Sequence, residues 1–266
     1  MVTTVIINAD DYGLTSAVSK GIREAFLNGI LTSTTVMASG LTLETDLPLL
    51  FKQCPAIGVG AHLTLTTLKP VLSADKIPSL VNEHGHFNRL GDLIAIAYHL
   101  NEAELYAEWK AQIDSLLAKG LELDHLDSHH SAGIISEKTV RVMIRLAGEY
   151  GLPVRKPQSS HRNKAMDAYA IVELDKHGIR YPKHFNGDFS DNKGTLESLI
   201  TIFTELKTGT TEIMSHPGYV DVDLENISSM VAPRLTELNS LCSAEAKQLI
   251  IDQHIQLATF GEVFKD

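Results

Sequence analysis

Two adjacent carboxylates, Asp10 and Asp11, follow a short apolar run at residues 5–7. Such a run is typical of a buried parallel strand. Two carboxylates at the end of that strand repel each other and lose contact with water, so a bound cation or a nearby arginine is the usual compensation. Thr15 and Ser16 lie closer to the start of the following helix and are the expected caps. The pair therefore predicts a metal site, with Asp11 as a ligand and Asp10 as a base.

Further polar side chains lie at or near the ends of four other predicted strands. Active sites of α/β barrels form at the carboxyl ends of the strands, so we expect these side chains to converge. They are His62 in residues 57–65, Asp127, His129 and His130 after residues 121–126, Arg155 at the end of residues 152–155, and His216 after residues 211–214. Five strands that deliver aspartate, histidine and arginine to one edge are difficult to explain by packing alone.

Asp11, His62 and His129 are the predicted metal ligands. Three protein ligands with open positions are typical of a catalytic metal rather than a structural one. One carboxylate and two imidazoles suit Zn²⁺ and its transition-metal neighbours better than Mg²⁺. His62 considered alone would be interpreted as a packed core histidine, and its two companions favour the ligand interpretation.

The remaining predicted catalytic residues surround this site. Asp10 could take a proton from a metal-held water that attacks a carbonyl, while the metal stabilises the oxyanion. His216 could then protonate a leaving nitrogen. Arg155 could hold Asp10 ionised and oriented, or it could pair with a surface carboxylate. The arrangement predicts hydrolysis of an amide.

The elements that must position these residues alternate between strand and helix. About seven strands alternating with helices predict one parallel α/β domain over residues 1–266, most simply a closed or distorted barrel of seven or eight strands. Residues 66–100 follow no regular pattern, and we expect a long excursion that serves as a lid or binding loop. Helices are expected at residues 17–28, 42–53, 101–119, 137–150, 195–206, 230–242 and 244–253.

The composition excludes several kinds of partner. The 266 residues carry a formal net charge of −10, which argues against nucleic acid and anionic membranes. Two cysteines without metal-type spacing predict a reducing, cytoplasmic location. We expect neither a signal peptide nor a membrane span, because the first residues lack a basic, apolar leader and no apolar run approaches about 20 residues.

Six segments together resemble one known family, the YdjC-like carbohydrate deacetylases, which includes the chitooligosaccharide deacetylase of chitobiose-utilisation operons. The resemblance covers essentially the whole chain, and the segments are specific in combination although each is weak alone. They are NADDYGL at residues 8–14, GILTST at 29–34, GAHL at 60–63, LDSHH at 126–130, SHPGY at 215–219 and PRLTEL at 233–238.

The resemblance implies a barrel of the sugar-deacetylase type that removes an N-acetyl group from an amino sugar. It implies a divalent metal on Asp11, His62 and His129, a base at Asp10 and an acid at His216. Members of the family are generally described as Mg²⁺-dependent, which differs from the metal that the two imidazoles favour. A homodimer is also a family expectation.

Three positions near the expected site keep more than one interpretation. Asp127 is expected to orient a histidine through its ring N–H or to form a strand-end turn. His130 belongs either to the pocket or to helix packing, and Tyr219 either lines the sugar site or packs on its rim. The family usually continues His-His-His-Val-His where this chain has residues 129–133, HHSAG, so two histidines are missing and the identity of the substrate is left open.

We therefore predict a metal-dependent N-deacetylase. Its expected substrate is a small acetylated amino sugar, such as a chitooligosaccharide, diacetylchitobiose or a phosphate of it. One alternative is a glycoside or phospho-glycoside hydrolase, which needs two carboxylates about 5–10 Å apart across a sugar; adjacent carboxylates among histidines fit a metal better. The other alternative is a non-catalytic sugar-binding or sensing domain.

Overall fold

A computed structural model of the chain describes residues 3–158 and 163–265. The chain falls into two compact units. The first comprises Met1–Val36, Gly40–Val59 and Pro182–Asp266, and the second comprises Met37–Ser39 and Gly60–Tyr181. The expectation of one domain over residues 1–266 stays a prediction.

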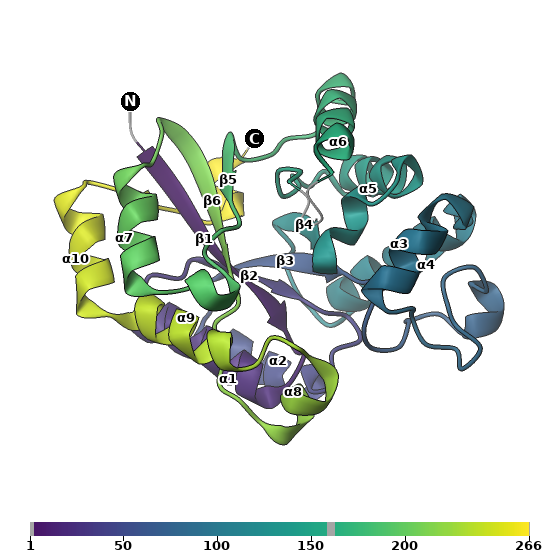
Figure 1. The fold of residues 1–266 in the computed structure, drawn as a ribbon, viewed down its shortest axis with the longest axis horizontal. Coiled ribbons are helices and arrows are strands. Elements are labelled where there is room, and N and C mark those ends of the chain that lie inside the picture. Colours follow the sequence, from purple (N-terminus) through teal and green to yellow (C-terminus); the bar gives the residue numbers. More distant parts are fainter. Residues whose placement is uncertain (1–2, 159–162, 266) are drawn as a thin grey trace. The chain divides into compact units, whose positions relative to one another are not determined.

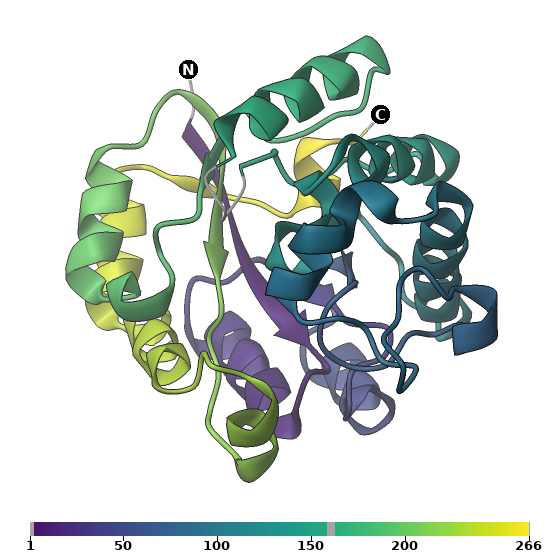
Figure 2. The same cartoon turned by 45° about the vertical axis from the view of Figure 1, so that its right-hand side comes forward.

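A parallel sheet forms the centre of the first unit. β1 (Thr3–Tyr12) lies between β2 (Ser33–Val36) and β6 (Gly209–Ser215), and β5 (His184–Asn186) pairs with the far side of β6 (Figure 1). β6 runs beside the purple strand β1 over seven residue pairs, from Thr3 with Gly209 to Ala9 with Ser215 (Figure 2). The short strand β7 (Gln256–Leu257) pairs with the start of β1. The apolar residues 5–7 are fully buried, as their sequence predicts.

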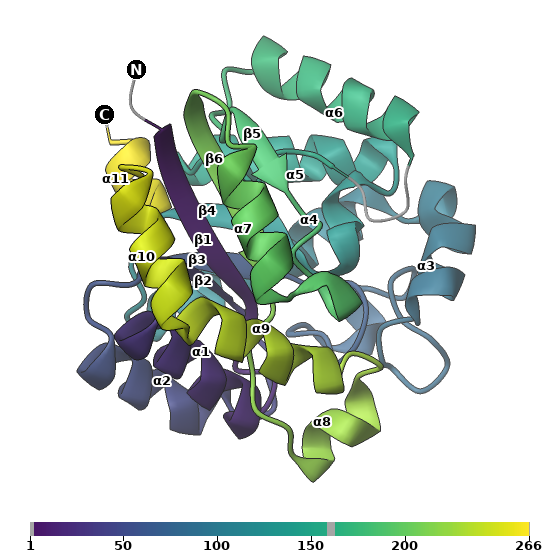
Figure 3. The ribbon, with the colours of Figure 1, turned by 60° about the vertical axis from the view of Figure 1, so that its left-hand side comes forward.

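Within the described part of the first unit there are seven helices. Helices α1 and α9 lie side by side (Figure 3), and the predicted cap of α1 is confirmed, because Thr15 accepts a hydrogen bond from Val18 N. The helices are α1 (Ser16–Asn28), α2 (Leu43–Gln53), α7 (Leu196–Thr204), α8 (Val222–Ile227), α9 (Ala232–Cys242), α10 (Ala244–Asp252) and α11 (Phe260–Val263).

A close backbone approach fixes the loop that follows β6. A Cβ atom on Gly21 of α1 would lie 2.5 Å from Gly218 Cα, so only glycine fits. The loop is also held by Tyr219 N, which donates to Ala17 O at 3.1 Å, and by Gly218 N, which donates to Arg234 O at 3.1 Å. The segment just after His216 is therefore clamped by α1 and α9.

Replacing Gly21 with alanine is expected to destabilise the protein by about 1–3 kcal/mol, because backbone rather than a flexible side chain must move. Helix propensity alone would favour alanine by about 1 kcal/mol. Gly148 of α5 is the matched control, since a Cβ there meets only Ile179 Cδ1 at 3.8 Å. Denaturant unfolding should show opposite signs for Gly21→Ala and Gly148→Ala. A stabilised Gly21→Ala protein would contradict the close approach.

Outside residues 159–162, which the structure does not describe, the second unit contains two parallel strands and four helices. β4 (His125–Ser128) pairs with β3 (Gly58–Leu63) so that His62 lies opposite Asp127. β3 begins within the first unit, where Gly58 N donates to Thr32 O at 3.0 Å. The helices are α3 (Leu90–Ile96), α4 (Glu102–Ala118), α5 (Glu137–Tyr150) and α6 (Lys164–Lys176), and 3₁₀ turns occur at Ala74–Lys76, Ala97–His99 and His129–Ile134, with one in the first unit at Asp191–Lys193.

The strand predicted at residues 152–155 is wrong in extent. Only an isolated parallel bridge joins Val154 to Leu126. Pro153 has no N–H to extend the ladder, and Val154 N donates instead to Arg180 O. The α/β class with parallel strands between helices is confirmed, whereas barrel closure and the number of strands stay predictions.

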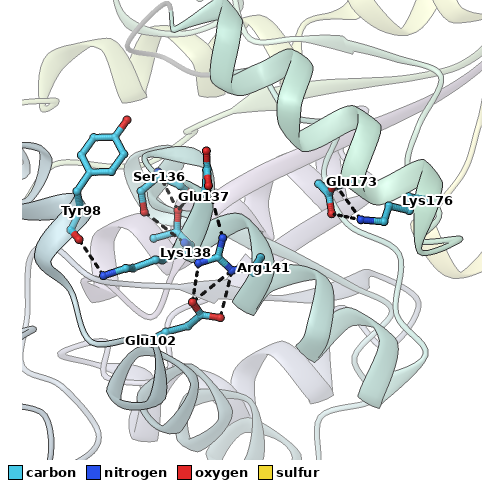
Figure 4. A network of polar contacts seen from close by, with 9 residues as sticks. Tyr98, Glu102, Ser136, Glu137, Lys138, Arg141, Glu173 and Lys176 are labelled. Atoms are coloured by element: carbon cyan, nitrogen blue, oxygen red, sulfur yellow. Dashed lines mark hydrogen bonds and ion pairs between the residues drawn. The ribbon is translucent and has the colours of Figure 1, made fainter.

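The excursion at residues 66–100 is ordered by contacts to α4 and α5. Glu108 accepts hydrogen bonds from Val71 N and Leu72 N, each at 2.9 Å. Lys138 donates to the carbonyls of Tyr98 and Leu100, each at 2.8 Å, as Figure 4 shows for Tyr98. These contacts attach both ends of the excursion to helices, and its role as a lid or binding loop stays a prediction.

The same two helices are joined to each other at the surface. Arg141 of α5 donates to Glu102 of α4 at 2.7 Å and approaches Glu137 at 3.6 Å (Figure 4).

Among the described residues, no helix combines the length and the apolar character needed to cross a membrane.

Candidate active site

The carboxylate pair lies inside β1 rather than after it. The sequence predicts the pair at the end of the strand, but β1 continues to Tyr12, with a register shift between Ala9 and Tyr12. Asp11 has φ of 76°, in the left-handed region, so the alternation of faces is interrupted there. Asp10 and Asp11 are both buried, at 3% and 1% exposed. The two carboxylates therefore lie at an irregularity within β1.

Each carboxylate has defined partners in the first unit. Asn8 Nδ2 donates to Asp10 Oδ1 at 2.9 Å, and His216 Nε2 lies 3.9 Å from Asp10 Oδ2. Arg234 Nη2 donates to Asp11 Oδ2 at 2.7 Å. The structure thus brings the predicted base and the predicted acid together, and an arginine compensates one of the two buried charges.

Tyr12, the residue after the pair, is held protonated. Its hydroxyl donates to Asp46 O at 2.7 Å and accepts from Arg23 Nη1 at 2.9 Å. Burial raises the pKa of Tyr12 well above its usual range. Tyr12 is therefore a packing residue and no candidate base.

The second unit supplies the histidines. Asp127 accepts from His62 Nδ1 through Oδ1 at 2.6 Å, and its other oxygen lies 2.9 Å from Arg155 Nη1. Because His62 Nδ1 is committed to Asp127, His62 presents Nε2 as its remaining nitrogen. That atom lies 3.3 Å from His129 Nδ1. If Asp127 orients a histidine, it must contact the ring N–H of that histidine. The structure contains this contact, between Asp127 and His62.

The segment after His129 has a constrained backbone. His130 and Ser131 have φ of 53° and 54°, in the left-handed region. The His129 and His130 rings lie 3.8 Å apart, and His130 Nδ1 contacts Thr66 Oγ1 at 2.9 Å. His130 is exposed while His129 is buried. The histidine pair is therefore split, with the first member directed inward and the second beside the excursion.

Tyr219 lies against α1. The Lys20 ammonium sits 4.8 Å from the centre of the Tyr219 ring, and the side chain is half-buried. Its predicted place in a sugar site stays a prediction, as does the predicted action of Arg155 on Asp10.

Two buried charged residues near the pair escaped sequence reasoning, Arg234 and Glu237. Arg234 contacts Asp11, and Glu237 Oε2 accepts from the backbone N of His216 at 2.5 Å. Both residues lie in the segment PRLTEL at residues 233–238, which the sequence analysis used only for the family resemblance. Two charged residues three positions apart on an otherwise amphipathic helix could have pointed to a shared, inward face.

Metal-ligating side chains lie together among the described residues of the second unit. His62 Nε2 and His129 Nδ1 face each other, and Asp127 holds the other nitrogen of His62. That Asp11 completes this ligand set stays a prediction. The donor chemistry fits a divalent cation, since two ligand nitrogens about 2.1 Å from a tetrahedral ion lie about 3.4 Å apart, close to the 3.3 Å between the two imidazoles.

Asp127→Asn is expected to weaken Zn²⁺ affinity by about 10–100-fold, the usual loss when an outer partner of a ligating histidine is changed. The matched control is Asp124→Asn, because Asp124 contacts His125 Nδ1 at the same 2.6 Å. Titration of metal-free protein with Zn²⁺ should show the loss only for Asp127→Asn. Equal affinities in the two variants would contradict the orienting role.

Comparison with known proteins agrees with the fold and the motifs. Residues 4–252 match the family of YdjC-like proteins. The carbohydrate deacetylases of Thermoanaerobacter pseudethanolicus and Brevibacillus brevis are each 36% identical over 260 residues, which cover 97% of this chain and 98% and 99% of theirs. A solved structure from Enterococcus faecalis, described provisionally as a cellobiose-phosphate cleavage protein, has a TM-score of 0.91 at 33% identity and covers 98% of this chain and 99% of its own.

Parallel strands between helices, with aspartates and histidines at the strand ends, define an α/β protein with a candidate metal centre. The chain belongs to the YdjC-like family, so the resemblance inferred from the six segments is confirmed.

Proposed function

We propose that the protein is a metal-dependent hydrolase that removes the N-acetyl group from a small acetylated amino sugar. The observation that carries the proposal is the arrangement of His62, His129 and Asp127, in which two imidazole nitrogens lie 3.3 Å apart and a buried carboxylate holds the first ring. The relatives named carbohydrate deacetylases support the reaction.

A single divalent cation on Asp11, His62 and His129 is part of the proposal. The two imidazoles favour Zn²⁺ or another transition metal, and the family resemblance favours Mg²⁺. When bound, the cation supplies an activated water and polarises the acetyl carbonyl.

The chain's own residues move the protons in this reaction. Asp10, held by Asn8, accepts the proton of the water that adds to the acetyl carbon. His216, 3.9 Å from Asp10, donates a proton to the sugar nitrogen as the C–N bond breaks. The products are acetate and a free amino sugar. Arg155, which pairs with Asp127, keeps the buried carboxylate array charge-balanced.

The substrate is a chitooligosaccharide, diacetylchitobiose or a phosphorylated form of it. The solved relative described as acting on cellobiose phosphate favours a disaccharide of this size and makes phospho-glycoside cleavage the second candidate. The contacts of the carboxylates favour deacetylation, since Asp11 is bound by Arg234 and Asp127 by His62 and Arg155. Because both carboxylates already bind cationic or ring N–H groups, neither is positioned to protonate a glycosidic oxygen.

The deciding experiment incubates metal-loaded protein with N-acetylated mono- and disaccharides, with and without phosphate, and follows acetate and new reducing ends. Acetate release without new reducing ends supports the proposal. New reducing ends without acetate would replace it with glycoside hydrolysis. Saturable sugar binding with neither product would indicate a non-catalytic sugar-binding protein.

A further inference from the structure

One face of α9 carries two buried charged side chains. Arg234 and Glu237 are three residues apart, hence on the same side of the helix, and they are 2% and 0% exposed. Arg234 Nη2 donates to Asp11 Oδ2 at 2.7 Å, and Glu237 Oε2 accepts from His216 N at 2.5 Å. A single helix face therefore contacts both a proposed metal ligand and the proposed acid.

We infer that Arg234 and Glu237 are positioning residues, which make α9 a common support for the metal ligand and the acid. Arg234 fixes the carboxylate of Asp11, and Glu237 fixes the peptide that carries His216. The inference rests on the proposed function, because the roles of Asp11 and His216 belong to it.

Arg234 is anchored at three points. Its Nε donates to Met230 O at 3.0 Å while Nη2 donates to Asp11. Its own carbonyl accepts from Gly218 N, two residues after His216. One residue thus ties the end of β1 to the loop after β6. Lysine could replace the charge of Arg234 but not both side-chain contacts, because it has one amine in place of a planar fork.

Asp11 needs external support to keep its conformation. Its φ of 76° is rare for a residue with a Cβ, and such strain persists only where the surroundings over-determine it. Strand pairing before and after Asp11 and the charge-assisted bond from Arg234 supply that constraint. A carboxylate held in one orientation loses less entropy when it binds an ion.

Gly194 leaves room for the side chain of Glu237. A Cβ on Gly194 would lie 2.1 Å from Glu237 Cγ, so the absence of a side chain there makes room. Ser240, one turn further along α9, donates to Gly194 O at 2.9 Å and keeps that turn in place. The carboxylate then makes a charge-assisted bond to the backbone of His216. Its placement sets the position from which His216 faces Asp10.

A purely structural role would lower stability without a selective effect on metal binding. The test for Arg234 therefore titrates metal-free protein with Zn²⁺ and records thermal unfolding of the same samples. The variants are Arg234→Met, Arg234→Lys and Asp11→Asn. The control is Arg23→Met, which breaks another buried arginine–aspartate pair in the same unit, with Asp46 at 3.5 Å.

We expect Arg234→Met to weaken Zn²⁺ binding by about 10–100-fold and Arg234→Lys by less, while Arg23→Met lowers the melting temperature without changing Zn²⁺ affinity. If Arg234→Met does not fold, Arg234→Lys decides the matter. Wild-type affinity in the Arg234 variants, with affinity lost in Asp11→Asn, would overturn the inference and leave the proposed function standing. Unchanged affinity in Asp11→Asn would overturn both.

Glu237 is tested by separating kcat from KM. Glu237→Ala should lower kcat for acetate release by about 10–100-fold, since a misplaced acid is costly, with KM and Zn²⁺ affinity unchanged. Glu237→Gln keeps an acceptor for His216 N and should recover most of kcat. A Glu237→Ala enzyme with wild-type kcat, or a Glu237→Gln enzyme no better than Glu237→Ala, would overturn this half of the inference.

Discussion

Asp10→Asn is expected to lower the rate of acetate release by about 10²–10⁴-fold, the usual contribution of a general base. Asp10 is buried and is held by Asn8, so the amide can occupy the same place without accepting a proton. Zn²⁺ affinity and thermal stability should change little, because Asp10 is outside the proposed ligand set. Steady-state kinetics together with Zn²⁺ titration measure the two effects separately.

The control for this variant is Asp46→Asn. Asp46 is an equally buried carboxylate in the same unit, paired with Arg23 rather than with His216. Its replacement should reduce stability and leave the catalytic rate unchanged once the protein is folded. Full activity in Asp10→Asn would remove Asp10 from the mechanism, whereas a matching loss in Asp46→Asn would mean that the rate reports general stability.

The strand-end chemistry could be predicted because it is local. A buried apolar run followed at once by carboxylates or histidines places those groups at a strand end without any knowledge of the rest of the chain. The structure accordingly has His62 opposite Asp127 on paired strands and Asp10 beside His216. The sequence signals for helices are also local, since caps and apolar periodicity lie within a few turns.

What could not be predicted depends on contacts between distant parts of the sequence. Arg234 meets Asp11 across 223 positions, and no periodicity or spacing indicates which buried charge an arginine on a helix will meet. The sequence predicts either a cation or an arginine beside the carboxylate pair. The structure supplies the arginine, and the metal stays a proposal. The left-handed φ of Asp11 is likewise set by the strands around it rather than by its own type.

Tertiary context also shortened two predicted strands. Residues 121–124 precede β4 without joining it, because Leu121 N turns back to Leu116 O at the end of α4. Beyond Pro153 only one bridge remains. In both places an apolar side chain is buried, Leu121 in the first and Val154 in the second, yet the backbone hydrogen bonds go elsewhere. Burial was therefore easier to predict than pairing.

His62→Ala is expected to abolish metal binding under conditions that saturate the wild type. His62 presents Nε2 3.3 Å from His129 Nδ1 while Asp127 holds its other nitrogen. Removing a ligand should weaken Zn²⁺ affinity by more than the roughly 100-fold seen when only an outer partner is lost. Metal content after dialysis and calorimetric titration measure the loss.

His125→Ala is the matched control for this experiment. Like His62, His125 is a buried histidine whose Nδ1 lies 2.6 Å from an aspartate oxygen, and it comes from the paired strand. Both variants remove a packed ring and should unfold at lower temperature. Ligand binding to the folded state stabilises it by about 2.7 kcal/mol at 100 times Kd, so Zn²⁺ should raise the melting temperature of His125→Ala and not that of His62→Ala. Equal Zn²⁺-dependent shifts would exclude His62 as a ligand, and the hydrolytic chemistry proposed for the site would lose its cation.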